Sequence, residues 1–257
     1  NNRATLRESV KRYTNSDMLF GIEQEYIIMD PVTNIPAGWT TKDGSLLYPQ
    51  GKYYCGVGGD VVTMRELVDD HAKCGIMAGI PVCGTNAEVM LSQWEYQIGP
   101  AGPLEVSDGL LVLRYMLSYL AEQRGVYISL NPKEIEGDWN GSGAHINFST
   151  EYMREHGGEE YITSICNALE TTHDFHIDNY GIGNEERLTG DHETQSIDKF
   201  TWGNSDRGAS IRIPPSTAET LKGYIEDRRP AANIDPYRAV NCLVKTIGVV
   251  DSTLIGV

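Results

Sequence analysis

The residue pattern that most restricts the fold of this chain is a run of regular alternation at residues 19–29. In an extended strand, successive side chains point to opposite faces, so residues two apart share a face. One face of this segment carries Phe20, Ile22, Gln24, Tyr26 and Ile28, and the other carries Gly21, Glu23 and Glu25. The alternation therefore predicts a β-strand that turns its apolar face to a core and carries two carboxylates on the opposite face.

Strands and helices are interleaved along the rest of the chain. Further strand-like segments are expected at residues 81–90, 93–98, 126–130, 143–148, 209–213 and 223–227. A short polar helix is expected at residues 5–16. Further helices are expected at residues 60–79, 107–123, 159–176 and 236–249, the first two from apolar residues on one face. Ser107 and Asp108 are expected to cap the third helix. Because several strands follow one another directly, the order favours an α+β fold over a doubly wound parallel sheet, with a curved, mostly antiparallel sheet flanked by helices.

Composition excludes some functions. The net charge of −15 argues against binding to a nucleic-acid backbone, since phosphates repel an acidic surface. Hydrophobic residues make up 40% of the chain, which is enough for a core, yet no apolar run approaches the ~18 residues of a membrane helix. The five cysteines are widely spaced and lack a C-x-x-C pair, which is typical of free thiols in a reducing compartment. We therefore expect a globular protein that binds neither nucleic acid nor a membrane.

Carboxylates recur on the predicted strands. Glu23 and Glu25 alone are typical of a solvent-facing strand edge, but Glu88 and Glu95 also lie between apolar or aromatic neighbours on strand-like segments. His145 follows a W-N-G-S-G turn, which brings the backbone close to another group. Glutamates with one histidine and no cysteine form a hard-oxygen site that suits Mg²⁺ or Mn²⁺.

Arginines are concentrated in the C-terminal third of this acidic chain. They are Arg187, Arg207, Arg212, Arg228 and Arg229. Any single one is as well explained by a surface salt bridge, but rigid bidentate donors are also what phosphate and carboxylate substrates need. No Walker or G-x-G-x-x-G loop is present, which disfavours a P-loop or kinase-like site. Together, the residue types predict metal-dependent phosphate chemistry on a small anionic substrate.

Eight motifs, in order along residues 20–249, closely resemble those of the eukaryotic-type (type II) glutamine synthetases. They are F-G-I-E-Q-E-Y (20–26), Y-Y-C-G-V-G (53–58), G-T-N-A-E-V-M (84–90), Q-W-E-Y-Q-I-G-P (93–100), G-D-W-N-G-S-G-A-H-I-N-F-S-T (137–150), R-L-T-G-D-H-E-T (187–194), A-S-I-R-I-P (209–214) and G-Y-I-E-D-R-R-P-A-A-N-x-D-P-Y (223–237). The resemblance implies the glutamine synthetase/guanidino-kinase-like catalytic fold. It also implies an ATP-dependent glutamate–ammonia ligase, which makes glutamine for nitrogen assimilation through γ-glutamyl phosphate.

The resemblance also implies roles for individual residues. One metal ion would be held by Glu25, Glu88 and Glu95, and another by Glu23, His145 and Glu226, in a site with two or three Mg²⁺ or Mn²⁺ ions. The residues that match those binding L-glutamate are Asn140, Gly141, His145, Arg187 and Arg228. Those that match nucleotide contacts are Asn147, Ser149, Arg207, Arg212 and Tyr224. The catalytic set is Arg187, Arg207, Arg228 and Glu193, the last matching a flap glutamate that helps to deprotonate ammonium.

Members of this family carry an N-terminal β-grasp domain, and each active site lies between two subunits. By this resemblance, residues 1–18 are a linker or the end of such a domain, and residues 19–257 are the catalytic domain of a longer protein. The resemblance further implies a homodecamer of two pentameric rings, located in the cytoplasm or in a plastid. Two other functions remain open from the sequence: a catalytically silent structural relative, and a related γ-glutamyl ligase that uses another amine, such as a polyamine.

Overall fold

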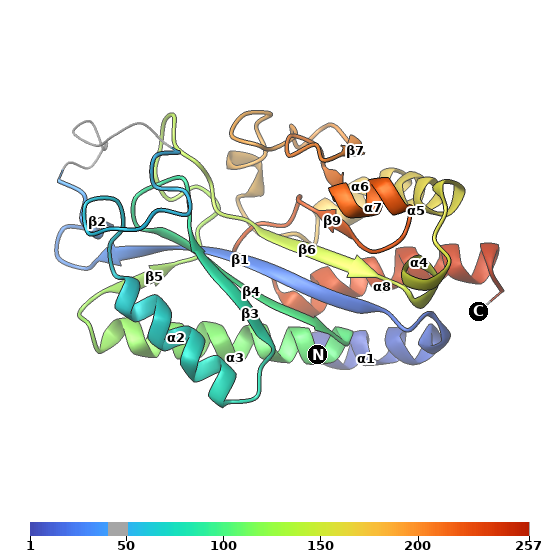
Figure 1. Cartoon of the computed structure of the whole chain (residues 1–257), viewed down its shortest axis with the longest axis horizontal. Helices are drawn as coiled ribbons and strands as arrows, with labels where there is room; N and C mark the ends of the chain where they lie inside the picture. Colours follow the sequence, from blue (N-terminus) through green and yellow to red (C-terminus); the bar gives the residue numbers. More distant parts are fainter. Residues whose placement is uncertain (41–50, 257) are drawn as a thin grey trace.

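A computed structural model describes residues 1–40 and 51–256. Part of the segment between the strand expected at residues 19–29 and the helix expected at residues 60–79 therefore lies outside the described residues. Strands in the described part form a mixed sheet in the order β3-β4-β1-β6-β9-β8-β7, with β2 and β5 also paired to β1 (Figure 1). The strands are β1 (Leu19–Asp30), β2 (Ile35–Pro36), β3 (Val82–Ala87), β4 (Gln93–Ala101), β5 (Tyr127–Ser129), β6 (Ala144–Ser149), β7 (Trp202–Asn204), β8 (Ile211–Ile213) and β9 (Ile225–Asp227).

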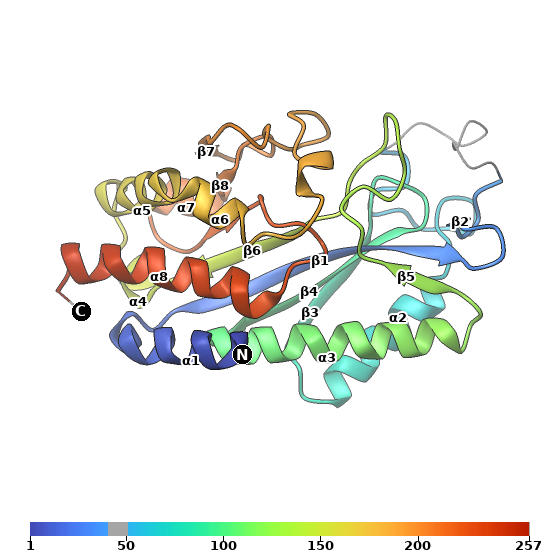
Figure 2. The same cartoon turned by 180° about the vertical axis from the view of Figure 1, so that it is seen from behind.

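Helices flank this sheet, as predicted. They are α1 (Asn2–Arg12), α2 (Arg65–Met77), α3 (Pro103–Glu122), α4 (Glu151–Glu155), α5 (Glu159–Thr171), α6 (His173–Ile177), α7 (Pro215–Thr220) and α8 (Pro236–Leu254), with short 3₁₀ turns at Thr14–Ser16 and Asn184–Glu186. Helix α3 packs against β1 and β4, while α8 packs against α1, α3 and α5. In Figure 2, α1 and α3 lie below β1, whereas the irregular segments that follow β5 and α6 lie above it.

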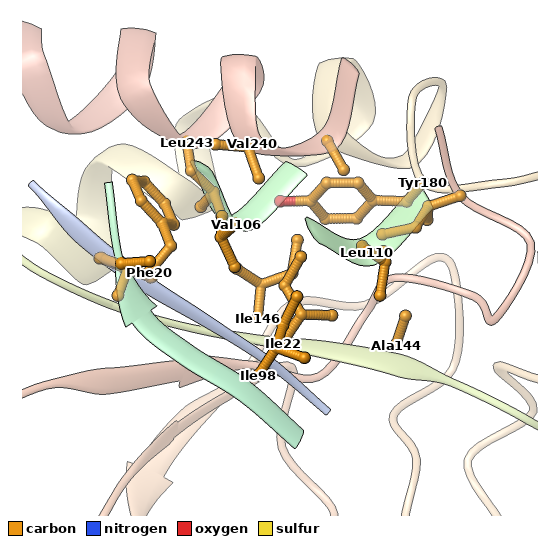
Figure 3. Close-up of a cluster of buried hydrophobic side chains, with 14 of the residues drawn as sticks. Phe20, Ile22, Ile98, Val106, Leu110, Ala144, Ile146, Tyr180, Val240 and Leu243 are labelled. Carbon is orange, nitrogen blue, oxygen red and sulfur yellow. The ribbon is translucent and has the colours of Figure 1, made fainter. Parts of the chain in front are cut away.

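The core lies on the apolar face of β1, as the alternation predicts. Phe20 and Ile22 are fully buried and pack in one cluster with Ile98 of β4, Ile146 of β6 and Leu243 of α8 (Figure 3). Burying such side chains contributes about 1.5–3 kcal/mol each. The opposite face of the same strand carries Glu23 and Glu25 and, farther along, Ile27 and Met29, which belong to a second and smaller apolar cluster.

Strand pairing is antiparallel except between β7 and β8, which confirms the mostly antiparallel α+β sheet. The register also sets the functional side chains opposite one another. Glu25 pairs with Glu95, and Glu23 pairs with His145. Residues directly opposite in an antiparallel pair project to the same face with their Cβ atoms about 5 Å apart. The register therefore gathers residues that lie more than a hundred positions apart in the sequence, such as Glu23 and His145.

Several helix boundaries differ from the predicted ones. Helix α2 begins at Arg65, because Met64 adopts a left-handed conformation with φ of 61° and interrupts the helical spacing that starts at residue 60. Helix α3 begins at Pro103, which occupies the first turn, where its missing N–H costs nothing. The predicted cap at Ser107 is wrong: this residue is buried inside α3, and its hydroxyl donates to the Pro103 carbonyl at 2.7 Å. The short elements α4, α7, β2 and β7 lie outside the helices and strands expected from the sequence.

Candidate active site

A cavity of about 320 Å³ opens on the carboxylate face of the sheet. Most of the predicted site residues line it: Glu23, Glu25, Glu88, Glu95, Asn140, Gly141, His145, Arg187, Glu193, Arg207, Arg212 and Arg228. Glu226 does not line the cavity, because it is only 2% exposed and lies behind two arginines. Acids from β1, the β3–β4 turn and β4 thus meet the imidazole of β6 and the guanidinium groups of β8 and of the irregular segments.

The predicted metal ligands fall into two clusters. In each of the sets Glu25–Glu88–Glu95 and Glu23–His145–Glu226, one ligand atom per residue lies within 4.8 Å of the others. We call the first set the three-glutamate cluster and the second the mixed cluster. The sets match those expected from the sequence, and their oxygen and imidazole donors suit Mg²⁺ or Mn²⁺. The role of each residue as a ligand stays a prediction.

The three-glutamate cluster concentrates negative charge in a buried place. Burial, and then the neighbouring Glu25, raise the pKa of Glu88 to about 8. Burial and three neighbouring carboxylates raise the pKa of Glu95 to about 9. Burial also raises the pKa of Glu25, although Arg187 opposes this effect. Bringing a divalent cation to these oxygens would relieve both the desolvation and the mutual repulsion.

In the mixed cluster, the negative charge of Glu226 is balanced by arginines of the protein itself. Glu226 accepts hydrogen bonds from Arg228 Nη1 at 2.6 Å and Arg212 Nη1 at 3.1 Å. Burial, and then the charge of Arg228, hold the pKa of His145 well below its usual value, so the imidazole is neutral. Its Nε2 accepts from Arg187 at 3.0 Å, which places the ring proton on Nδ1, the atom that faces the two carboxylates. To bind a cation at Nδ1, His145 would have to shift this proton.

Glycines make room for Arg187, which is buried beside His145. A Cβ atom at Gly141 would lie 2.7 Å from Arg187 Cγ, and one at Gly143 would lie 2.5 Å from Arg187 Nη2. Burial lowers the pKa of Arg187 to about 10, and its guanidinium donates to the Arg228 carbonyl at 3.2 Å. The close backbone approach expected after the W-N-G-S-G turn is therefore an approach to this arginine.

A loop with strained backbone covers one side of the cavity. His192 and Glu193 have φ angles of 53° and 59°, in the left-handed region that non-glycine residues rarely occupy. The Glu193 carboxylate lies 3.3 Å from Arg207 Nη1, and the Arg207 guanidinium lies 5.8 Å from the centre of the Tyr54 ring. Sequence analysis did not single out Tyr54 as a site residue, although it belongs to the quoted Y-Y-C-G-V-G motif.

Comparison with known proteins places this arrangement in a family. The family model described as "Glutamine synthetase, catalytic domain" matches residues 1–163. The chain is 48% identical over 256 residues to a chloroplastic glutamine synthetase of Brassica napus, covering 99% of this chain and 59% of the relative. It is 46% identical over 246 residues to a glutamine synthetase of Neurospora crassa, covering 96% of this chain and 67% of the relative. The chain belongs to the glutamine synthetase family.

Other matches in the glutamine synthetase family agree. A cytosolic glutamine synthetase isozyme of Daucus carota is 51% identical over 227 residues, covering 88% of this chain and 64% of the relative. A solved structure of apo GmaS without ligand has the same fold, with a TM-score of 0.78 and 19% identity over 98% of this chain and 58% of that chain. The chain thus spans about three-fifths of several relatives. None of the helices in residues 1–40 and 51–256 combines the length and apolar character needed to cross a bilayer.

A second cavity, of about 410 Å³, adjoins the first. Glu23 lines both cavities, and the three remaining residues predicted to contact nucleotide, Asn147, Ser149 and Tyr224, line the second. Its other walls are mostly apolar and come from β1, β4 and β6. Sequence analysis did not single out Arg154, whose Nη1 donates to Ser149 Oγ at 3.0 Å at the edge of this cavity. The predicted nucleotide residues are thus split between two cavities.

Arg229 does not belong with the other arginines. It is 1% exposed and forms an ion pair with Asp227 at 2.7 Å, while its guanidinium lies over the rings of Tyr180 and Phe200. Because side chains alternate along β9 and its extension, Arg228 faces the cavity and Arg229 faces the core. Grouping the two as substrate-facing cations was wrong for Arg229.

Proposed function

We propose that the protein containing this chain is an ATP-dependent glutamate–ammonia ligase. The observation that carries the proposal is the convergence of Glu25, Glu88 and Glu95 on the cavity that Arg187 and Arg228 also line. A site for attack of a carboxylate on a phosphoryl group needs this combination, because both reactants are anions. Sequence identity of 46–51% to glutamine synthetases over most of the chain supports the same conclusion.

The reaction has two steps. The γ-carboxylate of glutamate attacks the terminal phosphorus of ATP, which releases ADP and gives γ-glutamyl phosphate; ammonia then attacks the acyl carbon, and phosphate leaves. Arg207, Arg212 and Arg228 are proposed to stabilise the charge on the transferring phosphoryl group. Mg²⁺ or Mn²⁺ ions held by the two clusters would supply positive charge beside the phosphate oxygens.

The two cavities divide the substrates in this proposal. L-Glutamate lies in the first cavity against Asn140, Gly141 and His145, with its carboxylates paired to Arg187 and Arg228. The nucleoside part of ATP lies in the mostly apolar second cavity against Asn147, Ser149 and Tyr224. Support comes from the adjoining positions of the cavities, with Glu23 between them.

Ammonium is proposed to lose its proton to Glu193. The Glu193 carboxylate is about half exposed and pairs with Arg207, so this carboxylate becomes available as a base when Arg207 turns toward phosphate. The loop that carries Glu193 would also shield the acyl phosphate from water.

Formation of γ-glutamyl hydroxamate by the full-length protein tests the proposal. We expect product that depends on ATP and on Mg²⁺ or Mn²⁺, with ammonia preferred to polyamines when the two amines are compared as acceptors. Preference for a polyamine would identify a related ligase. No turnover, together with no thermal stabilisation by ATP and a phosphorylated glutamate-mimicking sulfoximine, would identify a catalytically silent relative.

The assembly, the division of the chain and the location belong to the same proposal. We propose a homodecamer of two pentameric rings, with residues 19–257 as the catalytic domain and residues 1–18 as a linker from a β-grasp domain. Light scattering of the full-length protein tests the subunit number. Relatives are named as both chloroplastic and cytosolic enzymes, so a cytoplasmic location, with a plastid as the other possibility, stays a prediction.

A further inference from the structure

Three carboxamide side chains surround the three-glutamate cluster, one for each carboxylate. Asn86 Nδ2 donates to Glu88 Oε1 at 2.9 Å, and Gln97 Nε2 donates to Glu95 Oε1. The amide of Gln93 approaches Glu25 Oε2 at 3.4 Å, and the backbone N–H of Gly143 donates to the same oxygen at 2.8 Å. Each carboxylate therefore has at least one oxygen engaged by a neutral donor, and Glu88 Oε2 also accepts from the backbone N–H of Val89 at 3.3 Å.

Two of these amides are also bonded to each other. Gln97 Nε2 donates to Asn86 Oδ1 at 2.6 Å, so a continuous path runs from Glu95 through Gln97 and Asn86 to Glu88. The pairing of β3 with β4 sets this path, because Asn86 lies opposite Glu95 and Gly84 lies opposite Gln97. Because Asn86 Oδ1 accepts from Gln97, the Nδ2 of Asn86 must point toward Glu88. We call Asn86 and Gln97 the amide relay.

Gly84 leaves the space that the relay occupies. A Cβ atom at residue 84 would lie 2.2 Å from Gln97 Oε1, far closer than non-bonded atoms approach. The contact is with the end of a side chain, so an alanine there would displace the Gln97 amide and leave the β-ladder in place. The backbone of β3 is thus shaped to let Gln97 lie across it.

Neutral donors have a particular consequence at a cation site. An arginine in place of either amide would neutralise the carboxylates and compete with a metal ion, as Arg212 and Arg228 do at Glu226. An amide fixes one carboxylate oxygen without adding charge, so the attraction for a cation is kept. Holding two carboxylates through one chain of hydrogen bonds also makes their positions interdependent.

We propose that Asn86 and Gln97 are positioning residues that act as one unit, orienting Glu88 and Glu95 to bind a single divalent cation. This inference rests on the proposed function, because it takes the three-glutamate cluster to be a metal site. Outer partners of metal ligands typically change metal affinity by about 10- to 100-fold when they are removed.

Calorimetric titration of the full-length, metal-stripped protein with Mn²⁺ alone tests the inference. We expect Asn86→Ala and Gln97→Met each to weaken Mn²⁺ binding by about 10- to 100-fold. We expect the double variant to bind no more weakly than the poorer single variant, since either change breaks the same path. In the hydroxamate assay, the Mn²⁺ concentration for half-maximal rate should rise by a similar factor, with the rate largely recovered at saturating Mn²⁺.

Two more variants separate the relay from general damage to the fold. Gly84→Ala keeps every polar group and displaces only the Gln97 amide, so it should weaken Mn²⁺ binding as Gln97→Met does. Asn179→Ala removes an amide that accepts from Arg238 and lines neither cavity, and this variant should bind Mn²⁺ as the wild type does. Circular dichroism checks that each variant is folded.

Each outcome bears on a different claim. Wild-type protein that binds no Mn²⁺ would overturn the proposed metal site itself. Wild-type binding with unchanged affinity in folded Gln97→Met and Gly84→Ala proteins would overturn the relay while leaving the metal site standing. Additive losses in the double variant would show that Asn86 and Gln97 act separately.

Discussion

The three-glutamate cluster and the mixed cluster lie on one face of the same sheet, yet their charges are balanced in different ways. Glu88 and Glu95 receive neutral amide donors and keep raised pKa values of about 8 and 9. Glu226 instead receives two guanidinium groups, within 3.1 Å. In the mixed cluster, only Glu23 has an amide donor, from Asn147 Nδ2 at 2.7 Å.

The difference shows that two acidic clusters of similar size can differ in how strongly they favour the binding of a cation. The raised pKa values of Glu88 and Glu95 mean that the metal-free three-glutamate cluster keeps protons, so a cation there replaces protons. The mixed cluster is already paired, so a cation there must compete with arginines and with the proton on His145 Nδ1. We therefore expect the first cluster to bind metal more tightly in the absence of substrate.

The largest expected effect is on turnover. Glu25→Ala and Glu226→Ala, one from each cluster, should each abolish hydroxamate formation and leave the protein folded, because the proposed reaction needs both clusters. The hydroxamate assay with circular dichroism measures this. Activity retained in either variant would mean that its cluster takes no part in the reaction.

The second effect separates the clusters by stability. Glu226→Gln should lower the free energy of unfolding by about 3–5 kcal/mol, because it removes the partner of two largely buried arginines. Glu95→Gln should leave the metal-free protein unchanged or more stable, since glutamine replaces a buried carboxyl whose raised pKa of about 9 already keeps it neutral near pH 7. Urea unfolding in the presence of a chelator measures the free energy of unfolding of both variants. Equal losses of stability in the two variants would contradict the proposed difference between the clusters.

A third and smaller effect comes from metal binding. Mn²⁺ at a hundred times its dissociation constant should stabilise the wild-type protein by about 2.7 kcal/mol. Glu88→Gln should lose most of this stabilisation, because it removes one of the three carboxylates. Thermal unfolding with and without Mn²⁺ measures the difference. If Glu88→Gln is stabilised as much as the wild type, the metal binds elsewhere.

The last comparison concerns the dependence of metal-free stability on pH. The raised pKa values of Glu88 and Glu95 mean that the folded state keeps protons that the unfolded chain loses near pH 4.5. The unfolded state then binds fewer protons, so these two groups make stability fall as pH rises from about 5 to about 9. Urea unfolding in chelator measures the stability across this pH range. Comparison of the wild type with the Glu88→Gln/Glu95→Gln double variant gives the contribution of Glu88 and Glu95 to the pH dependence. An equal slope in both proteins would contradict the raised pKa values.

Local pattern was enough to predict much of this protein. The alternation in residues 19–29 correctly assigned Phe20 and Ile22 to the core and Glu23 to the opposite face. The order of strands and helices predicted the mostly antiparallel sheet. Period-two alternation and strand order are properties of the chain itself, so they can be read without knowing which strands meet.

Strand register and packing decided what local pattern could not. Arg228 and Arg229 are neighbours of the same type, and only the fold sends one to the cavity and the other to a buried pair with Asp227. The amide relay exists only because β3 and β4 pair with Asn86 opposite Glu95. Pairing, burial and the charge that surrounds a group depend on residues distant in the sequence, and these are fixed only when the sheet assembles.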